Sequence, residues 1–245
     1  MLKTASDSFY GFSSPNFPQE KPNLLDDDEI QNVESNQNLP QKDSSKIEIE
    51  SRNVKEKIDS IAKKIAICTR CRLCQTRTRT VPGEGVLNPL VLVVGEGPGA
   101  DEDQSGLPFV GAAGKLLDKM LSAISLSRKK NCFIANVVKC RPPKNRTPFP
   151  DESASCRSFL EAQIAVLKPK AILAAGSTAL KTLLQTNAGV VKLHGQILSL
   201  NGIPLVATYH PSALLRFPEN KRIAWEDLKI FREKLREIDS NYEEN

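Results

Sequence analysis

The sequence predicts a three-layer α/β/α fold with a central, mostly parallel sheet of about four strands, preceded by a disordered N-terminal tail. Short apolar runs typical of buried strands alternate with longer segments of helical periodicity, which is the pattern of an open α/β sheet. The dipeptide Asn201-Gly202 lies between two apolar runs and predicts a tight hairpin turn. Because ligands bind an open α/β sheet at the carboxyl ends of its strands, functional residues should come directly after strands.

The expected elements alternate between strand and helix after one initial helix. The strands are apolar runs bounded by glycine, proline or polar residues, and they cover residues 90–95, 132–138, 171–175, 197–200 and 203–208. The helices have apolar residues at helical spacing or begin at a capping residue, and they cover residues 47–67, 112–125, 151–167, 177–185 and 221–238. Asp151, followed by Glu152, is the expected N-cap of the third of these helices.

The N-terminal part of the chain differs in composition from the rest. Residues 1–46 are rich in Asn, Gln, Ser, Asp and Pro without sustained periodicity, which predicts a disordered acidic tail, and residues 47–240 are expected to form one folded domain. The first 60 residues contain 12 acidic and 7 basic residues, a net charge of −5, so the remaining 185 carry +10. A basic body suits a phosphate-binding surface, although an ordinary solvated surface can carry the same charge.

The cysteine content and the apolar runs indicate the compartment. Six cysteines at uneven spacing, with no apolar N-terminal leader, argue against a secreted disulfide scaffold and favour reduced thiols, some of them metal ligands. No apolar run approaches the ~18 residues that are needed to span a bilayer. We therefore expect a soluble, cytoplasmic protein that does not contact a membrane and acts as a monomer.

The first motif, Gly95–Gly111, follows the first expected strand. Its glycines partly match the dinucleotide fingerprint G-x-G-x-x-G/A, but a dinucleotide fold needs a helix to begin at once. Here the acidic residues and a proline are expected to delay the helix until Ala112, and the acidic residues would repel a diphosphate. The segment instead offers a glycine-lined backbone and the ring of Phe109, on which a flat ligand can stack.

The second motif, Asn136–Arg146, follows the second expected strand. The amide of Asn136 can accept from an N–H and donate to a carbonyl, which fits the N3–H and O4 edge of uracil and mismatches cytosine. Arg141 and Arg146 are expected to face DNA phosphates. An asparagine that merely caps a turn is the alternative interpretation of Asn136.

The third motif, Tyr209–Arg216, follows the hairpin. The imidazole of His210 could donate a hydrogen bond to the negative charge that builds on a departing base. Its neighbours Leu214, Leu215 and Arg216 could insert into a duplex from which a base has been removed. An ordinary surface histidine is the alternative.

The cysteines form two groups along the chain. Cys68 and Cys71 make a C-x-x-C clip, which overlaps a second clip that ends at Cys74. Cys140 and Cys156 lie far along the chain. Four thiolates from such distant segments could form a zinc site or hold an iron–sulfur cluster, and their spacing does not separate the two.

The motifs together carry a resemblance to a known family. The segments in question are CTRCRLCQTRTRTVPGEG, GEGPGADEDQSGLPFVGAAG, NVVKCRPPKNR and HPSALLR, in that order. The chain from about Cys68 to Leu235 resembles the iron–sulfur (family four) uracil-DNA glycosylases. The resemblance implies an enzyme that flips deoxyuridine out of DNA and hydrolyses its N-glycosidic bond, releasing uracil and leaving an abasic site in base excision repair.

The resemblance also implies a cofactor and residue roles. It implies a [4Fe-4S] cluster on Cys68, Cys71, Cys140 and Cys156, with Cys74 and Cys132 outside the ligand set. Phe109 matches the uracil-stacking aromatic residue, Asn136 the base-reading amide and His210 the catalytic-loop histidine.

The resemblance leaves the water-activating residue open. Glu96 and Gly97 match the backbone wall of the pocket, but the wider superfamily often has an aspartate where this chain has Gly97. Glu102 is therefore the expected activator of the attacking water, and Asp103 is the second choice.

Two alternative functions are weighed against the glycosylase. A superfamily member that captures uracil-DNA covalently would need a histidine in an inserted basic loop, and none follows Arg146 there. A zinc-containing nucleic-acid-binding protein would use the same cysteines without a reaction.

Overall fold

The computed structural model describes residues 44–244, with side chains from residue 51 onward. The fold described below belongs to the compact unit Lys42–Asn245. The expected disordered tail lies almost entirely outside the described residues and stays a prediction. Helix α1 (Ser44–Ala66) begins slightly before the expected start.

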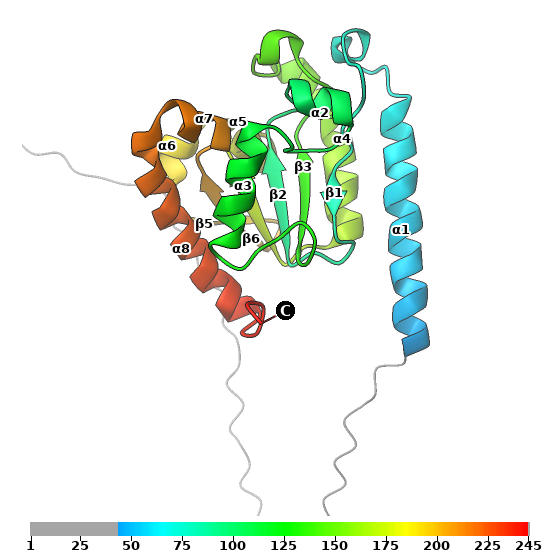
Figure 1. Cartoon of the computed structure of the whole chain (residues 1–245). Coiled ribbons are helices and arrows are strands. Elements are labelled where there is room, and N and C mark those ends of the chain that lie inside the picture. Colours follow the sequence, from blue (N-terminus) through cyan, green and yellow to red (C-terminus); the bar gives the residue numbers. More distant parts are fainter. Residues whose placement is uncertain (1–43, 245) are drawn as a thin grey trace, which may run out of the picture. The chain divides into compact units, whose positions relative to one another are not determined.

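A six-stranded sheet forms the centre of the fold, in the order β1-β3-β2-β4-β6-β5 (Figure 1). The strands are β1 (Glu84–Gly85), β2 (Val91–Gly95), β3 (Cys132–Asn136), β4 (Ala171–Ala175), β5 (Ile197–Leu200) and β6 (Ile203–Thr208). The four inner strands are parallel, whereas β1 and β5 pair antiparallel at the two edges. The mostly parallel sheet was expected, but it has six strands rather than about four: the five expected strand ranges correspond to β2–β6, and β1 lies outside them.

Strand β1 was not expected because it is two residues long and contains no apolar run. Its Gly85 adopts φ 144°, and an added Cβ would lie 2.2 Å from the carbonyl oxygen of Cys132 on β3. Only a glycine allows the two backbones to approach so closely.

Eight α-helices surround the sheet in the described part of the chain. After α1 these are α2 (Ala100–Ser105), α3 (Ala112–Ser122), α4 (Pro150–Leu167), α5 (Ser177–Leu184), α6 (Val190–Leu193), α7 (Pro211–Arg216) and α8 (Lys221–Ile238). Short 3-10 helices cover Arg72–Gln75, Pro143–Asn145 and Pro218–Asn220.

Two local expectations were wrong. Helix α2 begins directly after Gly99, so the acidic residues do not delay a helix; they form its first turn, where carboxylates are favourable beside free N–H groups. The N-cap of α4 is Phe149, and Asp151 lies inside the first turn. Glu152 completes that helix start, because its carboxylate accepts the backbone N–H of Phe149 at 2.8 Å.

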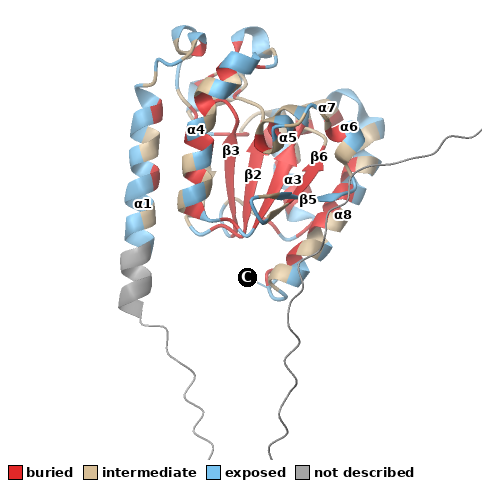
Figure 2. Ribbon diagram, turned by 180° about the vertical axis from the view of Figure 1, so that it is seen from behind, coloured by how far each residue is buried: buried red, intermediate tan, exposed pale blue. Residues whose placement is uncertain are grey.

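The core lies on both faces of the sheet, which confirms the three-layer α/β/α class. On one face Leu92 and Val94 of β2 pack with α4 and α5, and α1 packs against α4. On the other face Val91 and Val93 pack with α3 and α8. Figure 2 shows the buried inner strands of the sheet between helices whose outer surfaces are exposed.

The sheet brings the ends of its parallel strands together. Gly95, the last residue of β2, is paired in register with Asn136, the last residue of β3. Strand β6 ends at Thr208, whose carbonyl accepts the N–H of Gly176 just after β4. The expected functional segments therefore start from one edge of the sheet. Among the described residues, no helix combines the length and apolar character that crossing a membrane requires.

Candidate active site

A cavity of about 630 Å³ lies at the carboxyl edge of the sheet. Residues from all three motifs line it, among them Glu96, Gly97, Phe109, Asn136, Arg146 and His210. The structure thus brings together segments that are more than a hundred residues apart in the chain, as expected for a ligand site at strand ends.

The amide of Asn136 lies at the base of this cavity. Asn136 is only 1% exposed, and its Oδ1 has no hydrogen-bond partner among the described residues. A Cβ on Gly95 would lie 2.5 Å from this Oδ1 and 2.5 Å from Cζ of Phe109, so the glycine allows amide and ring to share the site. A buried polar atom without a partner is costly and points to a ligand that supplies the missing bond.

Phe109 is held in an uncommon backbone conformation. Its φ of 54° lies in the left-handed region, which bulky residues rarely adopt. Its ring centroid lies 5.6 Å from that of His210, with 32° between the planes. Such an outlier next to a cavity is typical of a functional site, where the surrounding contacts impose the conformation.

His210 is neutral and has a defined tautomer. The backbone N–H of Ser212 donates to Nδ1 at 3.2 Å, and the Ser212 hydroxyl lies 2.8 Å from the same nitrogen. Because Nδ1 accepts, the proton of the neutral ring is on Nε2, which is buried and has no partner in the described structure. Burial lowers the pKa of His210 to about 4, with Arg216 adding to the effect and Glu102 opposing it. The ring therefore presents an unused N–H donor at the cavity.

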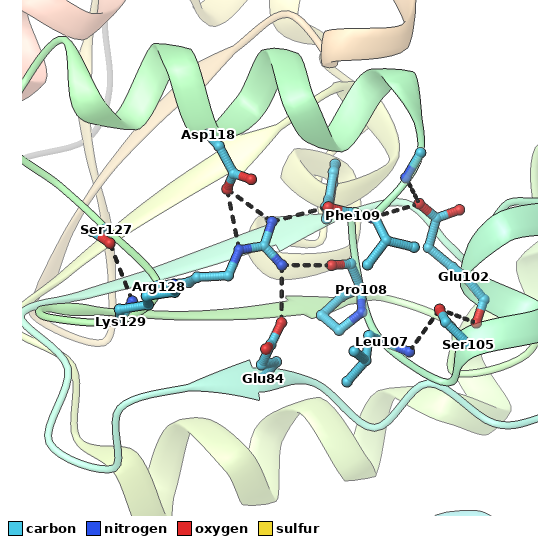
Figure 3. Close-up of polar contacts among 12 residues, drawn as sticks. Glu84, Glu102, Ser105, Leu107, Pro108, Phe109, Asp118, Ser127, Arg128 and Lys129 are labelled. Carbon is cyan, nitrogen blue, oxygen red and sulfur yellow. Dashed lines mark hydrogen bonds and ion pairs between the residues drawn. The ribbon is translucent and has the colours of Figure 1, made fainter.

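Glu102 uses its carboxylate mainly to organise the backbone. Its Oε2 accepts the N–H of Gly99 at 3.0 Å. Its Oε1 accepts the N–H groups of Val110 at 2.9 Å and Gly111 at 3.0 Å (Figure 3). Both acceptor positions of Oε1 are occupied, which leaves at most one position on Oε2 for a water molecule. Glu102 as the activator of water stays a prediction, restricted to that oxygen.

The second choice, Asp103, faces away from the cavity. It is buried, and its Oδ1 accepts the N–H groups of Thr78 at 2.9 Å and Arg79 at 3.3 Å. It does not line the cavity, so the second choice of Asp103 as the activator of water was wrong. It holds the segment between the cysteine clips and β1 against α2.

Two residues of the site were missed in the sequence. The hydroxyl of Thr178 donates to Oε2 of Glu96 at 2.5 Å and directs that carboxylate. Ser212 sets the tautomer of His210. Thr178 lies just after β4 and could have been found by the rule that site residues follow strands, whereas the contact of Ser212 with the ring depends on the start of α7.

The expected DNA contacts on α7 are only partly available. Leu215 and Arg216 are exposed and line the cavity. Leu214 is only 1% exposed, because it is on the inner face of α7 and packs into the core with α3 and α8. The expectation that Leu214 contacts a duplex was therefore wrong.

The two arginines of the second motif differ in their surroundings. Arg146 lines the cavity, forks onto the buried carboxylate of Glu152 at 2.7 and 2.8 Å, and lies 3.8 Å from the ring centroid of Phe149. Arg141 does not line the cavity, and its Nε donates to Asn145 at 2.8 Å. Both lie near the rim, but the charge of Arg146 is already partly compensated.

The expected metal ligands gather at a second, smaller cavity. It is lined by residues that include Cys68, Cys71, Cys74, Cys140 and Cys156. Within residues 44–244, no group of three or more Cys, His, Asp or Glu side chains has the geometry for a single metal ion. Cys132 is buried in β3 apart from this group, and burial raises its pKa to about 12. The thiol therefore stays protonated and packs like a small apolar side chain.

Donors point at the sulfur atoms of the second cavity. Arg77 donates to Sγ of Cys140 at 3.2 Å, and the backbone N–H of Lys139 donates to Sγ of Cys156 at 3.4 Å. Burial raises the pKa of Cys140 to about 11 and also raises that of Cys156. Thiols in this setting become thiolates only with strong positive charge nearby, such as iron or zinc supplies.

A buried lysine connects the two cavities. Lys139 is 1% exposed, and its ammonium donates to the carbonyl of Asn136 at 2.8 Å and to Oε1 of Gln163 at 2.7 Å. Burial lowers its pKa to about 8. The residue beside the cysteine cavity thus holds the backbone of the residue that presents its amide to the first cavity.

An open α/β sheet with an unpartnered amide oxygen, an aromatic ring and a neutral imidazole donor at its strand ends has the geometry of a site for a flat heterocyclic ligand. Comparisons with known proteins specify the class. The family model of the uracil DNA glycosylase superfamily matches residues 82–229. The chain is 43% identical over 178 residues to a type-4 uracil-DNA glycosylase of Thermotoga maritima, covering 71% of this chain and 92% of that protein.

Further relatives agree. A type-4 uracil-DNA glycosylase of Sulfurisphaera tokodaii is 39% identical, covering 73% of this chain and 84% of that protein. A type-5 uracil-DNA glycosylase of Pyrobaculum aerophilum is 31% identical, covering 64% and 83% respectively. This chain belongs to the uracil-DNA glycosylase superfamily, in its type-4 family.

The lowered pKa of His210 predicts acid sensitivity of the fold. Between the ordinary value of 6.5 and about 4, the unfolded chain binds more protons at this position than the folded one, so stability falls as the pH drops through this window. The parent protein should lose on the order of 2 kcal/mol of its free energy of unfolding between about pH 7 and about pH 4.5 because of His210, and His210→Gln should not show this loss. Urea unfolding of both proteins at the two pH values measures it, and a variant as acid-sensitive as the parent would contradict it.

Proposed function

We propose that this protein is a uracil-DNA glycosylase, which extrudes a deoxyuridine from DNA and hydrolyses its N-glycosidic bond to release uracil and leave an abasic site. The observation that carries the proposal is the first cavity, where the unpartnered amide of Asn136, the ring of Phe109 and the unpartnered Nε2–H of His210 meet. The type-4 and type-5 relatives are named for the same activity.

Recognition of the base uses two of these groups. Extrusion of a nucleotide costs a few kcal/mol of stacking and pairing, which a mismatched or single-stranded base reduces. The ring of Phe109 then stacks on the base, and the amide of Asn136 bonds its Watson–Crick edge, with Oδ1 accepting the N3–H of uracil. Cytosine has no N–H at that position, so the same amide disfavours it.

His210 supports departure of the base. As the glycosidic bond lengthens, negative charge builds on the uracil and positive charge on the sugar. The Nε2–H of His210 donates to that negative charge without any prior protonation of the ring, because its pKa lies far below neutral pH. A preorganised donor of this kind typically contributes ~3 kcal/mol to the transition state.

A carboxylate at the cavity orients the attacking water in this proposal. Glu102 can do so only through Oε2, since backbone N–H groups occupy Oε1. Glu96 also lines the cavity and is directed by Thr178. Negative charge from either residue also stabilises the positive sugar of the transition state.

DNA binding is assigned to the basic body around the cavity. Leu215 and Arg216 on α7 form one side of the opening, and Arg141 and Arg146 lie on the segment after β3. These arginines, of which Arg216 is exposed and Arg141 and Arg146 are partly buried, neutralise phosphates, and Leu215 can fill the space left in the stack. We keep the monomeric state and the cytoplasmic location as predictions.

We further infer that the second cavity holds a [4Fe-4S] cluster on Cys68, Cys71, Cys140 and Cys156. The donor set fits a thiolate-bound cluster, because N–H groups of Arg77 and Lys139 point at two of the sulfurs. When bound, the cluster ties the end of α1, the segment after β3 and α4 into one unit. No step of the reaction passes through it.

Loss of the two polar groups should affect catalysis more than binding. We expect His210→Ala or Asn136→Ala to lower the rate of uracil release by about 100-fold or more, the usual effect of losing one such donor, with little change in the Kd for uracil-containing DNA. Release of uracil and alkali-labile cleavage of an oligonucleotide measure the first, and fluorescence anisotropy measures the second.

His194→Ala is the matched control, since this second histidine lies outside the cavity. Equal losses of binding and release would argue against the assigned roles. A denaturant-resistant adduct in place of free uracil would indicate the covalent trap instead.

The cluster predicts a spectrum and a metal content. Protein purified without air should be brown, with broad visible absorbance and about four iron atoms per chain. Cys156→Ala should lose both, whereas Cys132→Ala should keep them, because Cys132 lies in β3 away from the second cavity. A colourless parent protein that contains zinc would refute the iron assignment.

A further inference from the structure

We propose that Arg128 is a positioning residue for the stacking ring, and that together with Glu102 it holds Phe109 in its left-handed backbone conformation. The inference deepens the proposed function and rests on it for the meaning of the ring. Arg128 does not line the cavity, and of the residues assigned to contact the base it touches only Phe109, so it acts through Phe109.

The guanidinium of Arg128 binds two consecutive carbonyl groups of the Phe109 turn (Figure 3). Its Nη1 donates to the carbonyl of Pro108 at 2.8 Å, and its Nη2 donates to that of Phe109 at 2.9 Å. The peptide groups on both sides of the Phe109 Cα are therefore hydrogen-bonded to one rigid planar guanidinium. Only arginine presents donors in such a fork.

Glu102 holds the same turn from the other side. The peptide group between Phe109 and Val110 has its oxygen on Arg128 and its N–H on Oε1 of Glu102, at 2.9 Å. A positive and a negative side chain thus hold the two ends of one peptide dipole. Rotation of Phe109 out of the left-handed region would break these charge-assisted bonds together.

Close packing reinforces the turn. A Cβ on Gly114 in the first turns of α3 would lie 1.9 Å from the carbonyl oxygen of Phe109. The backbone of α3 therefore lies directly against the residue whose ring must face the cavity. Left-handed φ is costly for a phenylalanine, so a structure that keeps it must compensate elsewhere.

Arg128 is itself fixed by two carboxylates. Glu84 of β1 accepts from Nη1 at 2.9 Å, and Asp118 of α3 accepts from Nη2 at 2.8 Å and from Nε at 3.1 Å. The arginine side chain is 14% exposed. These contacts connect β1, the turn and α3, and they give the two-residue strand β1 a task in the active site.

A double-mutant cycle separates positioning from general stability. We expect Arg128→Met to lower kcat/KM for uracil release about 10- to 100-fold, the range that corresponds to loss of a base-stacking contact. In a Phe109→Ala background, where there is no ring to position, Arg128→Met should lower kcat/KM for uracil release by less than about twofold. Arg236→Met is the matched control, because that arginine also pairs with two carboxylates, Glu233 and Glu243, but lies on α8.

A spectroscopic measurement tests the inference without relying on activity. Fluorine NMR of fluorophenylalanine-labelled protein, with the Phe109 resonance assigned from Phe109→Ala, reports the ring directly. Arg128→Met should shift or broaden that resonance, and Arg236→Met should not. If Arg128→Met fails to fold, Arg128→Lys keeps the charge beside Glu84 and Asp118 without the fork, and it should show the same coupling to Phe109.

The outcomes distinguish two kinds of failure. A parent protein that releases no uracil would refute the proposed function, while the fluorine resonance would still test the role of Arg128. An equal loss of kcat/KM in both backgrounds, or an unchanged Phe109 resonance in Arg128→Met, would overturn the inference and leave Arg128 with a general structural role.

Discussion

The parallel pairing of β2 with β3, in the register that places Gly95 opposite Asn136, is the constraint on which the rest of the site depends. It sets the amide of Asn136, to which we assign base reading, beside the residue that opens the glycine-rich segment. Because Gly95 has no side chain, the ring of Phe109 can approach that amide. A slip by one residue would turn Asn136 to the other face of the sheet and separate the two.

The polar groups that face the cavity lack hydrogen-bond partners, whereas other atoms of the same residues are hydrogen-bonded to the surrounding structure. Oδ1 of Asn136 and Nε2 of His210 are buried without partners in the described structure, which costs free energy in the absence of ligand. Their other ends are well bonded: Lys139 holds the carbonyl of Asn136, and Ser212 holds Nδ1 of His210. The free protein is less stable because of these unpartnered atoms, but the atoms are already oriented toward the cavity. In the proposed reaction, little reorganisation would then be needed when charge develops on the base.

The sequence predicted the parallel strands, the hairpin and the meeting of three motifs at one edge, because these follow from hydrophobic periodicity and turn chemistry. It could not predict contacts that depend on exact backbone paths. Two of the three backbone bonds of Glu102, those from Val110 and Gly111, arise only once the turn at Phe109 has formed, so the residue resembled a free catalytic carboxylate. Leu214 was misplaced because a six-residue helix is too short for its inner face to be recognised by periodicity. Strand β1 was invisible for a related reason, since backbone proximity at Gly85 defines it rather than apolar side chains.

Several carboxylates near the cavity bind groups of the protein itself, which explains how the acidic first turn of α2 is compatible with a site proposed to face DNA. The carboxylates of Asp103 and Glu102 accept hydrogen bonds from backbone N–H groups, and the carboxylate of Glu152 accepts two from the guanidinium of Arg146. These carboxylates thus act as local braces within the fold, and most of their acceptor capacity is not available to ligands. Glu96 and the exposed Asp101 also line the cavity, and their negative charge would stabilise the positive sugar of the proposed transition state. In the proposed function the arginines at the rim bind phosphates, so the same face would attract the DNA backbone and stabilise an electron-poor sugar within it.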